Sequence, residues 1–180
     1  MSATVISVSA RNGHGLGKTV QRQITLIAGE GVEGDAHCGV TVKHRSRVAK
    51  DPTQPNLRQV HLIHSELLTE VAGHGFHVLP GELGENILTV GVALLNLPTG
   101  TLLNIGSTVV IKIEGLRNPC SQINGHTPHL MDAMLGRGPG CSLIRKAGVM
   151  GTVLAGGRVS VGESISVVIP DAPHFGLIPV

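Results

Sequence analysis

Two segments of this chain repeat one pattern, and that pattern limits the folds open to it. Residues 97–113 (LPTGTLLNIGSTVVIKI) and 154–169 (LAGGRVSVGESISVVI) each contain a turn glycine, a short apolar strand, an Ile-Gly or Val-Gly kink and a longer alternating strand. A glycine inside a strand pattern indicates a bulge or a tight bend. Repeated units of this kind favour a mainly β fold, a strongly curved, closed or nearly closed β-barrel with a few short helices.

The rest of the chain fits a single domain of this class. Its 180 residues can bury a core of their own, and 25 glycines are interspersed with short runs of Val, Ile and Thr. Further strands are predicted over 4–10, 22–29 and 57–63. Short helices are predicted over 65–73, capped by Ser65, and over 127–136, capped by Thr127. We therefore expect one domain over residues 1–170 and a surface tail over 171–180.

Charge and aromatic content argue against a nucleic-acid partner. The formal net charge is only +2, from 14 Lys and Arg against 12 Asp and Glu, whereas a nucleic-acid footprint needs a clustered basic surface. The chain has two Phe, no Trp and no Tyr, so bases would find few rings to stack on.

Neither a membrane span nor a secretory signal is predicted. Residues 86–111 contain no charged residue, but glycines, asparagines and Pro98 interrupt them, which indicates strand, turn and strand. The start, MSATVISVSARNG, has no apolar h-region behind a basic n-region. Three cysteines without a C-x-x-C pair favour reduced thiols, so we expect a cytoplasmic protein.

The ten histidines do not form a recognisable zinc motif. His61 and His64 lie three residues apart on a predicted strand, so they should face opposite sides and not share a metal. No C-x-x-C or H-E-x-x-H supplies another ligand set. His37 stands apart from the others because it lies in a glycine-flanked loop beside Asp35 and Cys38.

Two polar segments are predicted as loops. Residues 40–57 carry four Lys and Arg residues and end in DPTQPN, which is typical of an exposed, mobile loop. PGELGENI (80–87) contains Glu82 and Glu85, a pair of the type used in acid–base catalysis. Its proline and glycines favour a double turn instead, with the carboxylates in a structural role.

Cys120, in the stretch LRNPCSQI, is the strongest candidate for chemistry. The alternating strand 107–114 ends just before it, and Pro119 keeps Asn118 extended, so the thiol should be presented on a turn. Arg117 and free backbone N–H groups nearby would favour the thiolate. A thiolate can bind a soft or high-valent metal, act as a nucleophile or carry a persulfide. The alternative is a cysteine that is simply buried, and the spacing alone leaves both open.

Six stretches occur here in the order found in one known family. They are GVEGDAHCG, LRQVHLI, PGELGENI, LPTGTLLNIG, LRNPCSQI and RKAGVMGTVLAGGRVSVGE, and together they span about residues 30–170. In these stretches the sequence resembles a stand-alone bacterial-type MOSC domain, named after the C-terminal domain of molybdenum cofactor sulfurase. The resemblance implies a strongly curved β-barrel, in agreement with the strand pattern.

The resemblance also implies an activity. Members bind a molybdopterin-type molybdenum cofactor, or are proposed sulfur carriers, through a cysteine that aligns with Cys120. Some relatives reduce N-hydroxylated compounds such as hydroxylaminopurines and amidoximes with electrons from partner proteins. Pyridoxal phosphate binding is also described for the family, but this chain has no lysine motif for it. The chain lacks the N-terminal extension and the ferredoxin-like cysteine cluster of larger relatives, so a separate electron-donor protein is expected.

Roles for individual residues follow from that cofactor. A molybdopterin carries an anionic phosphate and a polar pterin, so it needs cations and amide donors around an open metal position. The candidates are Arg117, Arg58 and Lys146 for the anionic part, Asn86 and Asn118 for the pterin edge, Glu85 to orient them, and His37 as proton donor. For each of these, a surface ion pair or a turn role is the alternative.

Three functions therefore remain open from the sequence. The first is a molybdenum-dependent reductase of N–O bonds in small molecules, with Cys120 as the metal ligand. The second is a sulfur carrier, or a cofactor-binding module without redox catalysis. The third is a barrel with a structural cysteine that docks onto other proteins.

Overall fold

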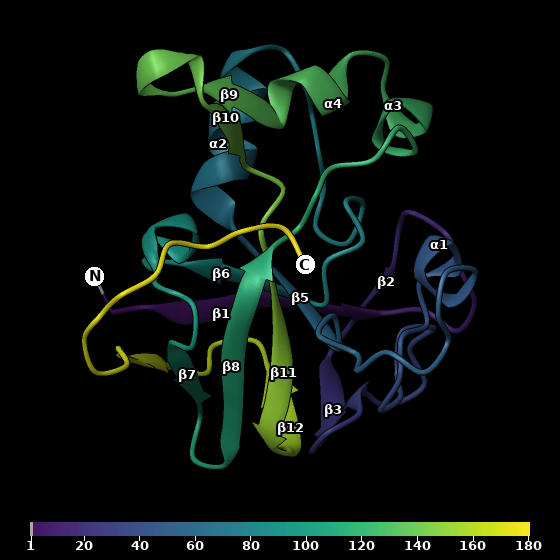
Figure 1. The fold of residues 1–180 in the computed structure, drawn as a ribbon, viewed down its shortest axis with the longest axis vertical. Coiled ribbons are helices and arrows are strands. Elements are labelled where there is room, and N and C mark those ends of the chain that lie inside the picture. The colour runs from purple at the N-terminus through teal and green to yellow at the C-terminus, as the bar shows by residue number, and fades with distance from the viewer. Residues whose placement is uncertain (1) are drawn as a thin grey trace.

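The computed structural model describes residues 2–180, with the side chains of His126 and Pro139 left aside. Figure 1 shows most of the strands in the lower part of the molecule, and most of the helices, together with one short strand pair, above them. The strands are β1 (Thr4–Ala10), β2 (Thr19–Gln21), β3 (Gln23–Ile27), β4 (Gly31–Val32), β5 (Val60–His64), β6 (Ile87–Val90), β7 (Leu102–Ile105), β8 (Val109–Leu116), β9 (Leu135–Arg137), β10 (Leu143–Arg145), β11 (Val149–Ala155), β12 (Gly157–Ser160) and β13 (Ile165–Val168). The helices are α1 (Arg45–Val48), α2 (Ser65–Gly73), α3 (Ile123–His126) and α4 (Leu130–Ala133), with 3-10 turns at Leu94–Asn96 and Pro139–Cys141.

Eight strands form one mixed sheet in the order β13-β7-β8-β11-β5-β6-β1-β2. Only β5 and β6 run parallel among these neighbours. A three-stranded sheet (β12-β3-β4) and a β9-β10 hairpin complete the strand pairing of the described residues. The mainly β class with few short helices is confirmed. Within the described residues, β13 and β2 stand at the two ends of this strand order. Ile165 N of β13 also donates to Ala3 O, just before β1 (2.8 Å), but no strand ladder joins the two ends. A closed barrel is therefore not confirmed and stays a prediction.

The two similar sequence segments fold into different surroundings. In the first, β7 and β8 form a hairpin that turns at Gly106, which has a φ of +59°. In the second, β12 pairs with β3 whereas β13 pairs with β7, so the two strands belong to different sheets. The same local pattern therefore fixes the strands but not their partners, since pairing depends on long-range packing.

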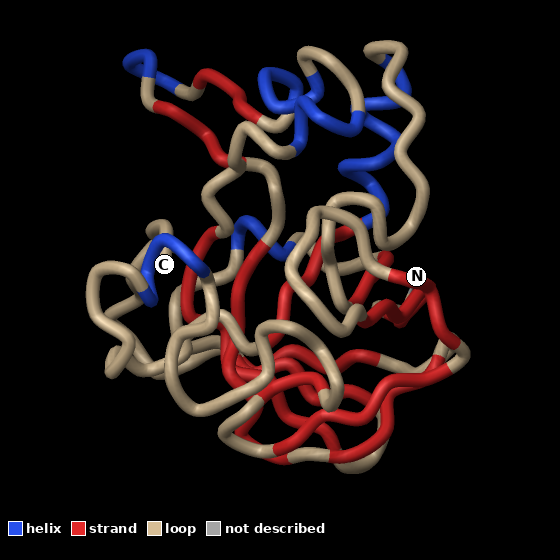
Figure 2. Tube along the Cα trace, turned by 90° about the vertical axis from the view of Figure 1, so that its right-hand side faces the viewer, coloured by secondary structure: helices blue, strands red, loops and turns tan. Residues whose placement is uncertain are grey.

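Two apolar clusters hold the sheets and helices together. The larger lies inside the sheets and includes fully buried Leu62, Ile87 and Ile111. The smaller includes Leu67 and Val71 of α2 together with residues of the α3 and α4 region, and so fixes the helices above the sheet. Figure 2 shows the same division, with most strands below, and most helices and the β9–β10 hairpin above. None of the helices in the described part of the chain is long and apolar enough to cross a membrane.

One of the two predicted helices is confirmed and the other is confirmed only in part. Helix α2 matches the prediction over 65–73, although its N-cap is His64 rather than Ser65. Of the helix predicted over 127–136, only α4 (Leu130–Ala133) forms; α3 lies before that range, and β9 begins at Leu135. Thr127 is extended, with φ −142° and ψ 128°, as expected for a residue that precedes a proline. His129 then adopts a left-handed φ of 66° and turns the chain into α4.

The residues of the predicted tail run along the end of β8. Leu116 N donates to Ile178 O (2.8 Å), and Val180 N donates to Leu116 O (3.2 Å). A Cβ at Gly115 would lie only 2.3 Å from Ile178 O, so a glycine is needed where the tail crosses the strand. This crossing places Pro179 and Val180 beside the cavity described next.

Candidate functional site

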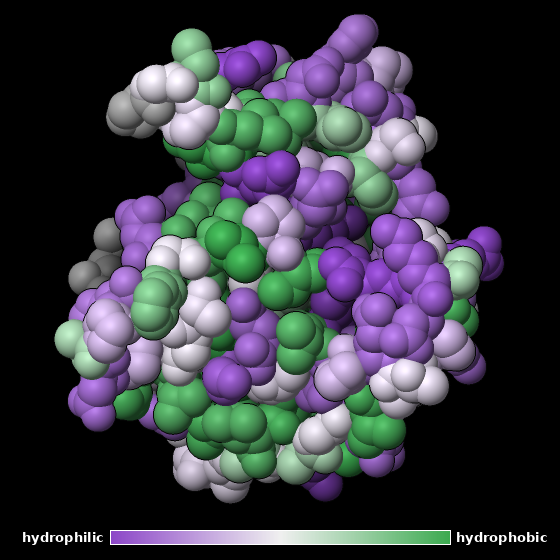
Figure 3. Space-filling view, in the orientation of Figure 1, coloured by the Kyte–Doolittle hydropathy of each residue, from purple (hydrophilic) through white to green (hydrophobic). Residues whose placement is uncertain are grey.

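A cavity of about 780 Å³ opens where several loops meet. Its walls come from residues 14–18, from segments 37–58 and 84–86, from the turn that follows β8, and from the last two residues. Figure 3 shows hydrophilic side chains gathered on the side of the molecule where α1 lies in Figure 1. Volumes of this size are typical of sites for small molecules and cofactors.

The lining of this cavity is strongly cationic. It contains no Asp or Glu, and four histidines contribute rings: His14, His37, His44 and His61. The Lys and Arg residues of the lining are Lys18, Arg45, Arg47, Lys50, Arg58, Arg117 and Arg145. The nearly neutral total charge of the chain conceals this local concentration of positive charge. Such a cavity attracts anions and disfavours cations.

Cys120 lies on this wall, on the turn that follows β8. Its neighbour Pro119 is buried, and the Cys120 side chain is half-buried and free of disulfides. The Cys120 Sγ–H donates to Gln122 Oε1 across 3.8 Å. The strand end therefore presents a thiol to the cavity, as the sequence predicts.

Two arginines bring positive charge to the Cys120 side of the cavity. Arg117 Nη1 donates to Leu83 O (2.7 Å), which fixes a guanidinium that is only 9% exposed. Burial lowers the pKa of Arg117, and a negative charge on Cys120 would raise it again. Burial, with the charges of Arg47 and Arg117, lowers the pKa of Arg58 to about 10. A guanidinium stays protonated in proteins, so both arginines can stabilise an anion at or next to Cys120.

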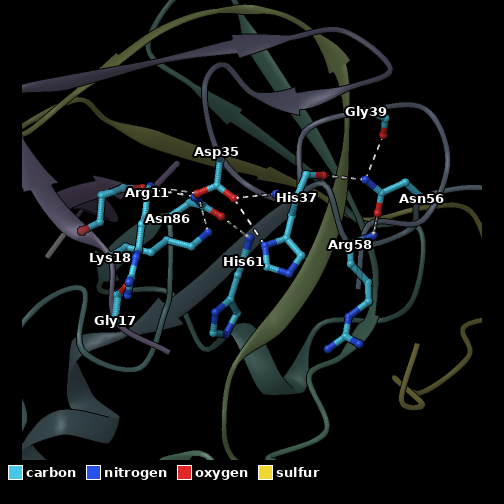
Figure 4. A network of polar contacts seen from close by, with 11 residues as sticks. Arg11, Gly17, Lys18, Asp35, His37, Gly39, Asn56, Arg58, His61 and Asn86 are labelled. Carbon is cyan, nitrogen blue, oxygen red and sulfur yellow. Dashed lines mark hydrogen bonds and ion pairs between the residues drawn. The ribbon is translucent and has the colours of Figure 1, made fainter. Parts of the chain in front are cut away.

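Asp35 is the centre of a polar network behind the cavity (Figure 4). Its carboxylate receives Lys18 Nζ at 2.8 Å, His37 N at 3.0 Å and Asn86 Nδ2 at 3.1 Å. His37 Nδ1 lies 3.4 Å from the same carboxylate. Burial alone would raise the pKa of Asp35, but the hydrogen bonds from His37 and the charge of Lys18 outweigh burial and lower it. Asp35 thus stays ionised and holds His37 and Lys18 in place.

Asn86 and His61 are structural parts of the cavity floor. Asn86 Oδ1 accepts from His61 N (3.1 Å), and Asn86 Nδ2 donates to Ser9 O and to Asp35 (3.1 Å each). Its two donors are therefore already used by the protein. His61 Nε2–H donates to Ala147 O (2.8 Å), and burial lowers the pKa of this fully enclosed imidazole well below its usual value. His64, on the same strand, lines a separate pocket, so the two histidines face different cavities as expected.

Most of the predicted site residues meet at this cavity. Those that line it are Cys120, His37, Arg117, Asn118, Arg58 and Asn86. Asn118 Oδ1 accepts from Arg145 Nε (2.8 Å), so it positions a further cation.

Two predicted site residues lie outside the cavity lining. Lys146 Nζ forms an ion pair with Glu70 of α2. Glu85 is 2% exposed, its carboxylate accepts from Gly81 N, and burial raises its pKa. The negative charge of Glu85 still acts on Arg117. Its place is thus behind the cavity rather than in it.

The glycines of PGELGENI have a clear structural role. Gly84 has a φ of +81°, and a Cβ there would lie 2.3 Å from Leu16 O. Gly81 has a φ of +87°, and Lys18 N donates to Gly81 O (2.8 Å). The predicted double turn therefore packs directly against the loop that carries Lys18 into the cavity.

Sequence reasoning missed the contribution of segment 40–57. It was expected to be an exposed loop, but it contains α1 and lines the cavity with Arg45, Arg47 and Lys50. The signal was present as basic residues two or three positions apart, but only the fold shows which of them face inward. No group of three or more metal-ligating side chains occurs among the described residues.

Comparisons with known proteins agree with this fold. The family model described as MOSC domain matches residues 49–166. The crystal structure of the YuaD protein from Bacillus subtilis superposes with a TM-score of 0.77 at 23% identity, covering 95% of this chain and 98% of that one. YiiM from Escherichia coli superposes with a TM-score of 0.64 at 22% identity, and covers 97% of this chain and 73% of its own. YiiM from Geobacillus stearothermophilus gives 0.66 at 16% identity, with 97% and 79% covered. A search of curated proteins found no significant match.

Proposed function

The chain belongs to the MOSC domain family, and from this premise we propose that it binds a molybdopterin-type molybdenum cofactor through Cys120 and reduces N–O bonds of small N-hydroxylated compounds. The observation that carries the proposal is a single half-buried thiol on the wall of a cavity whose charged lining residues are all cationic. This combination suits an anionic cofactor that carries a thiophilic metal.

The side chains present fit such a cofactor. A bare metal ion needs several protein ligands, and the described residues offer no group of three or more. A metal that arrives inside an organic chelate needs only one ligand from the protein, and Cys120 can be that ligand. Arg117 and Arg58 would hold the anionic part next to it. Asn118 has its Oδ1 occupied by Arg145 and keeps its amide N–H groups for the pterin edge.

Reduction of an N–O bond has a simple balance. R–NHOH, two electrons and two protons give R–NH₂ and water. The cofactor, when bound, would supply the electron pair, and a separate electron-donor protein would restore it. His37 would supply a proton: its Nδ1 faces Asp35 at 3.4 Å, which leaves Nε2 for exchange with a ligand.

Metal content is the direct test. The wild-type protein, expressed with ample molybdate, should retain close to one molybdenum per chain, and Cys120→Ser should lose most of it. Cys141→Ser is the matched control, since Cys141 is exposed and does not line the cavity. Molybdenum absent from the wild type, or equal in wild type and Cys120→Ser, would refute the proposal.

The second candidate is a sulfur carrier, with a persulfide on Cys120. It is favoured by the same two arginines, because they would stabilise a persulfide anion as well as a thiolate. Intact-mass analysis after incubation with a cysteine desulfurase should then show one added sulfur atom, lost on reduction and absent from Cys120→Ser. An unmodified thiol together with bound molybdenum would decide for the reductase.

The remaining expectations belong to the same proposal. A small molecule is the substrate, and the three free cysteines agree with a reducing compartment such as the cytoplasm. The buried lysine of the cavity, Lys18, is committed to Asp35. Its amine is therefore not free for a Schiff base with pyridoxal phosphate.

A further inference from the structure

Segment 40–57 forms a cationic wall of the cavity that Cys120 also lines. Arg45, Arg47 and Lys50 line this wall. None of the three takes part in the ion pairs between described residues. Lys43 belongs to the same segment but does not line the cavity, and its side chain lies over Gly39. Three unpaired cations on one wall form a surface for an anion with several charged oxygens.

This wall is anchored to the rest of the fold. Val42 N donates to Gln54 O and Asn56 N to Val40 O (3.0 Å each), which joins the two ends of the segment. The buried Asn56 Nδ2 donates to His37 O (2.8 Å) and Gly39 O (2.9 Å). Asn56 is 3% exposed, so these hydrogen bonds are shielded from water. The base of the wall therefore has a fixed position relative to His37.

Three imidazole rings lie beside these cations. The His14 and His37 rings meet edge to face with centroids 5.5 Å apart, and the His37 and His44 rings are stacked at 6.3 Å. Burial, followed by the charges of Arg58, His37 and Arg47, lowers the pKa of His44 to about 4. Burial and the charges of His37 and Arg45 also lower the pKa of His14. His44 is therefore neutral at pH 7, and the protonation of His14 is disfavoured. Such rings offer a face on which a flat heterocycle can stack.

We propose that this wall is a subsite for a phosphate monoester attached to a flat heterocycle, with the phosphate on Arg45, Arg47 and Lys50 and the ring on the histidine cluster. The inference rests on the proposed function in one respect: in a reductase of N-hydroxylated compounds, the subsite would favour a nucleotide-like substrate over the uncharged base. A phosphate of this kind has two sources, the substrate and the cofactor. The test has one arm for each.

The substrate arm is calorimetric titration of the full chain with adenosine monophosphate, adenosine and inorganic phosphate. In the wild type the monophosphate should bind about tenfold more tightly than adenosine, since one charge-assisted hydrogen bond gives about that factor. Arg45→Gln combined with Lys50→Gln should reduce that preference, since only Arg47 then remains for the phosphate, and should leave adenosine binding unchanged. Lys43→Gln is the matched control, because it removes a charge from the same segment without touching the cavity, and it should keep the preference.

The cofactor arm is the molybdenum content of the same variants. If the double variant loses molybdenum while its nucleotide preference persists, the wall binds the cofactor phosphate and the substrate assignment is overturned. Equal binding of adenosine and its monophosphate in the wild type would overturn it too, as would an equal loss in Lys43→Gln. Cys120→Ser separates this inference from the proposed function, because it should keep the nucleotide preference whether or not the wild type holds molybdenum.

Discussion

Replacing Asp35 by asparagine should destabilise the protein more than any other single loss of charge near the cavity. The Asp35 side chain is 1% exposed and faces Lys18, whose own side chain is 7% exposed. Burial lowers the pKa of Lys18, and the charge of Asp35 is the largest effect that opposes this. Without the carboxylate, the ammonium of Lys18 is left buried and unpaired. Breaking one partner of a buried pair in this way costs about 3–5 kcal/mol.

The pH dependence of this effect has a definite sign. The pKa of Asp35 is lower in the folded than in the unfolded protein, so the unfolded chain binds the proton more tightly. The contribution of Asp35 to stability is therefore complete above the unfolded pKa of about 3.9, and is lost as the pH falls towards the folded pKa. The difference between wild type and Asp35→Asn should accordingly be constant from pH 5 to 8, a window that lies above the unfolded pKa by at least about one unit, and should shrink in stronger acid.

Urea unfolding, followed by circular dichroism, measures this difference. Asp35→Asn should lower the midpoint without changing the slope, and thermal melting should fall by roughly 10 °C. Asp171→Asn is the control, since Asp171 is exposed and should change stability by less than about 0.5 kcal/mol. Adding Lys18→Met to Asp35→Asn should recover part of the loss, because the unpaired charge is removed. A loss below about 1 kcal/mol for Asp35→Asn, or no recovery in the double variant, would refute the reasoning.

Three further predictions concern single residues. Gly84→Ala should lower the free energy of unfolding in urea by about 1–3 kcal/mol or more, because the new Cβ clashes with Leu16 O and the residue has a left-handed φ. Gly34 also has a left-handed φ but lies in open space, so Gly34→Ala should lower that free energy distinctly less. Cys38 should react with iodoacetamide more slowly than exposed Cys141 at pH 7.5, because burial and nearby carboxylates raise the pKa of Cys38. Peptide mass spectrometry measures the two rates, and a faster reaction at Cys38 would contradict the prediction. His61 should show no titration by NMR between pH 5 and 8, and stability should fall as the pH drops below about 6.5, because its pKa is lowered on folding.

Much of this architecture could be predicted from local sequence patterns. Strands β1, β3 and β8 and helix α2 follow from alternation, helical periodicity and flanking turns. The place of Cys120 beyond β8 follows from the alternating strand before it and from Pro119. These features depend on residues close in sequence, and local rules are reliable there.

Other features depend on contacts between distant residues. The inward position of α1 requires Asn56 to join its base to the His37 loop, and no local pattern shows that hydrogen bond. Lys146 was predicted as a cofactor ligand, but Glu70 lies within reach, 76 residues away, and pairs with it. Cys141 lies in a strand-like run of the sequence, GCSLIRKAG, but it is exposed and has a left-handed φ of 59°. In each case contacts between residues distant in sequence decide which of the locally allowed arrangements forms.

The distribution of charge indicates that this cavity binds a ligand rather than stabilises the fold. Two buried carboxylates lie behind it: Asp35 neutralises Lys18, and Glu85 acts on Arg117. The two carboxylates therefore act on the two most buried cations, Lys18 and Arg117. The other Lys and Arg residues of the lining keep their full charge. A set of like charges held together is unfavourable for the folded state, since each lowers the pKa of its neighbours, as Arg47 and Arg117 do for Arg58. A bound anion removes that repulsion, so binding and folding stability are coupled.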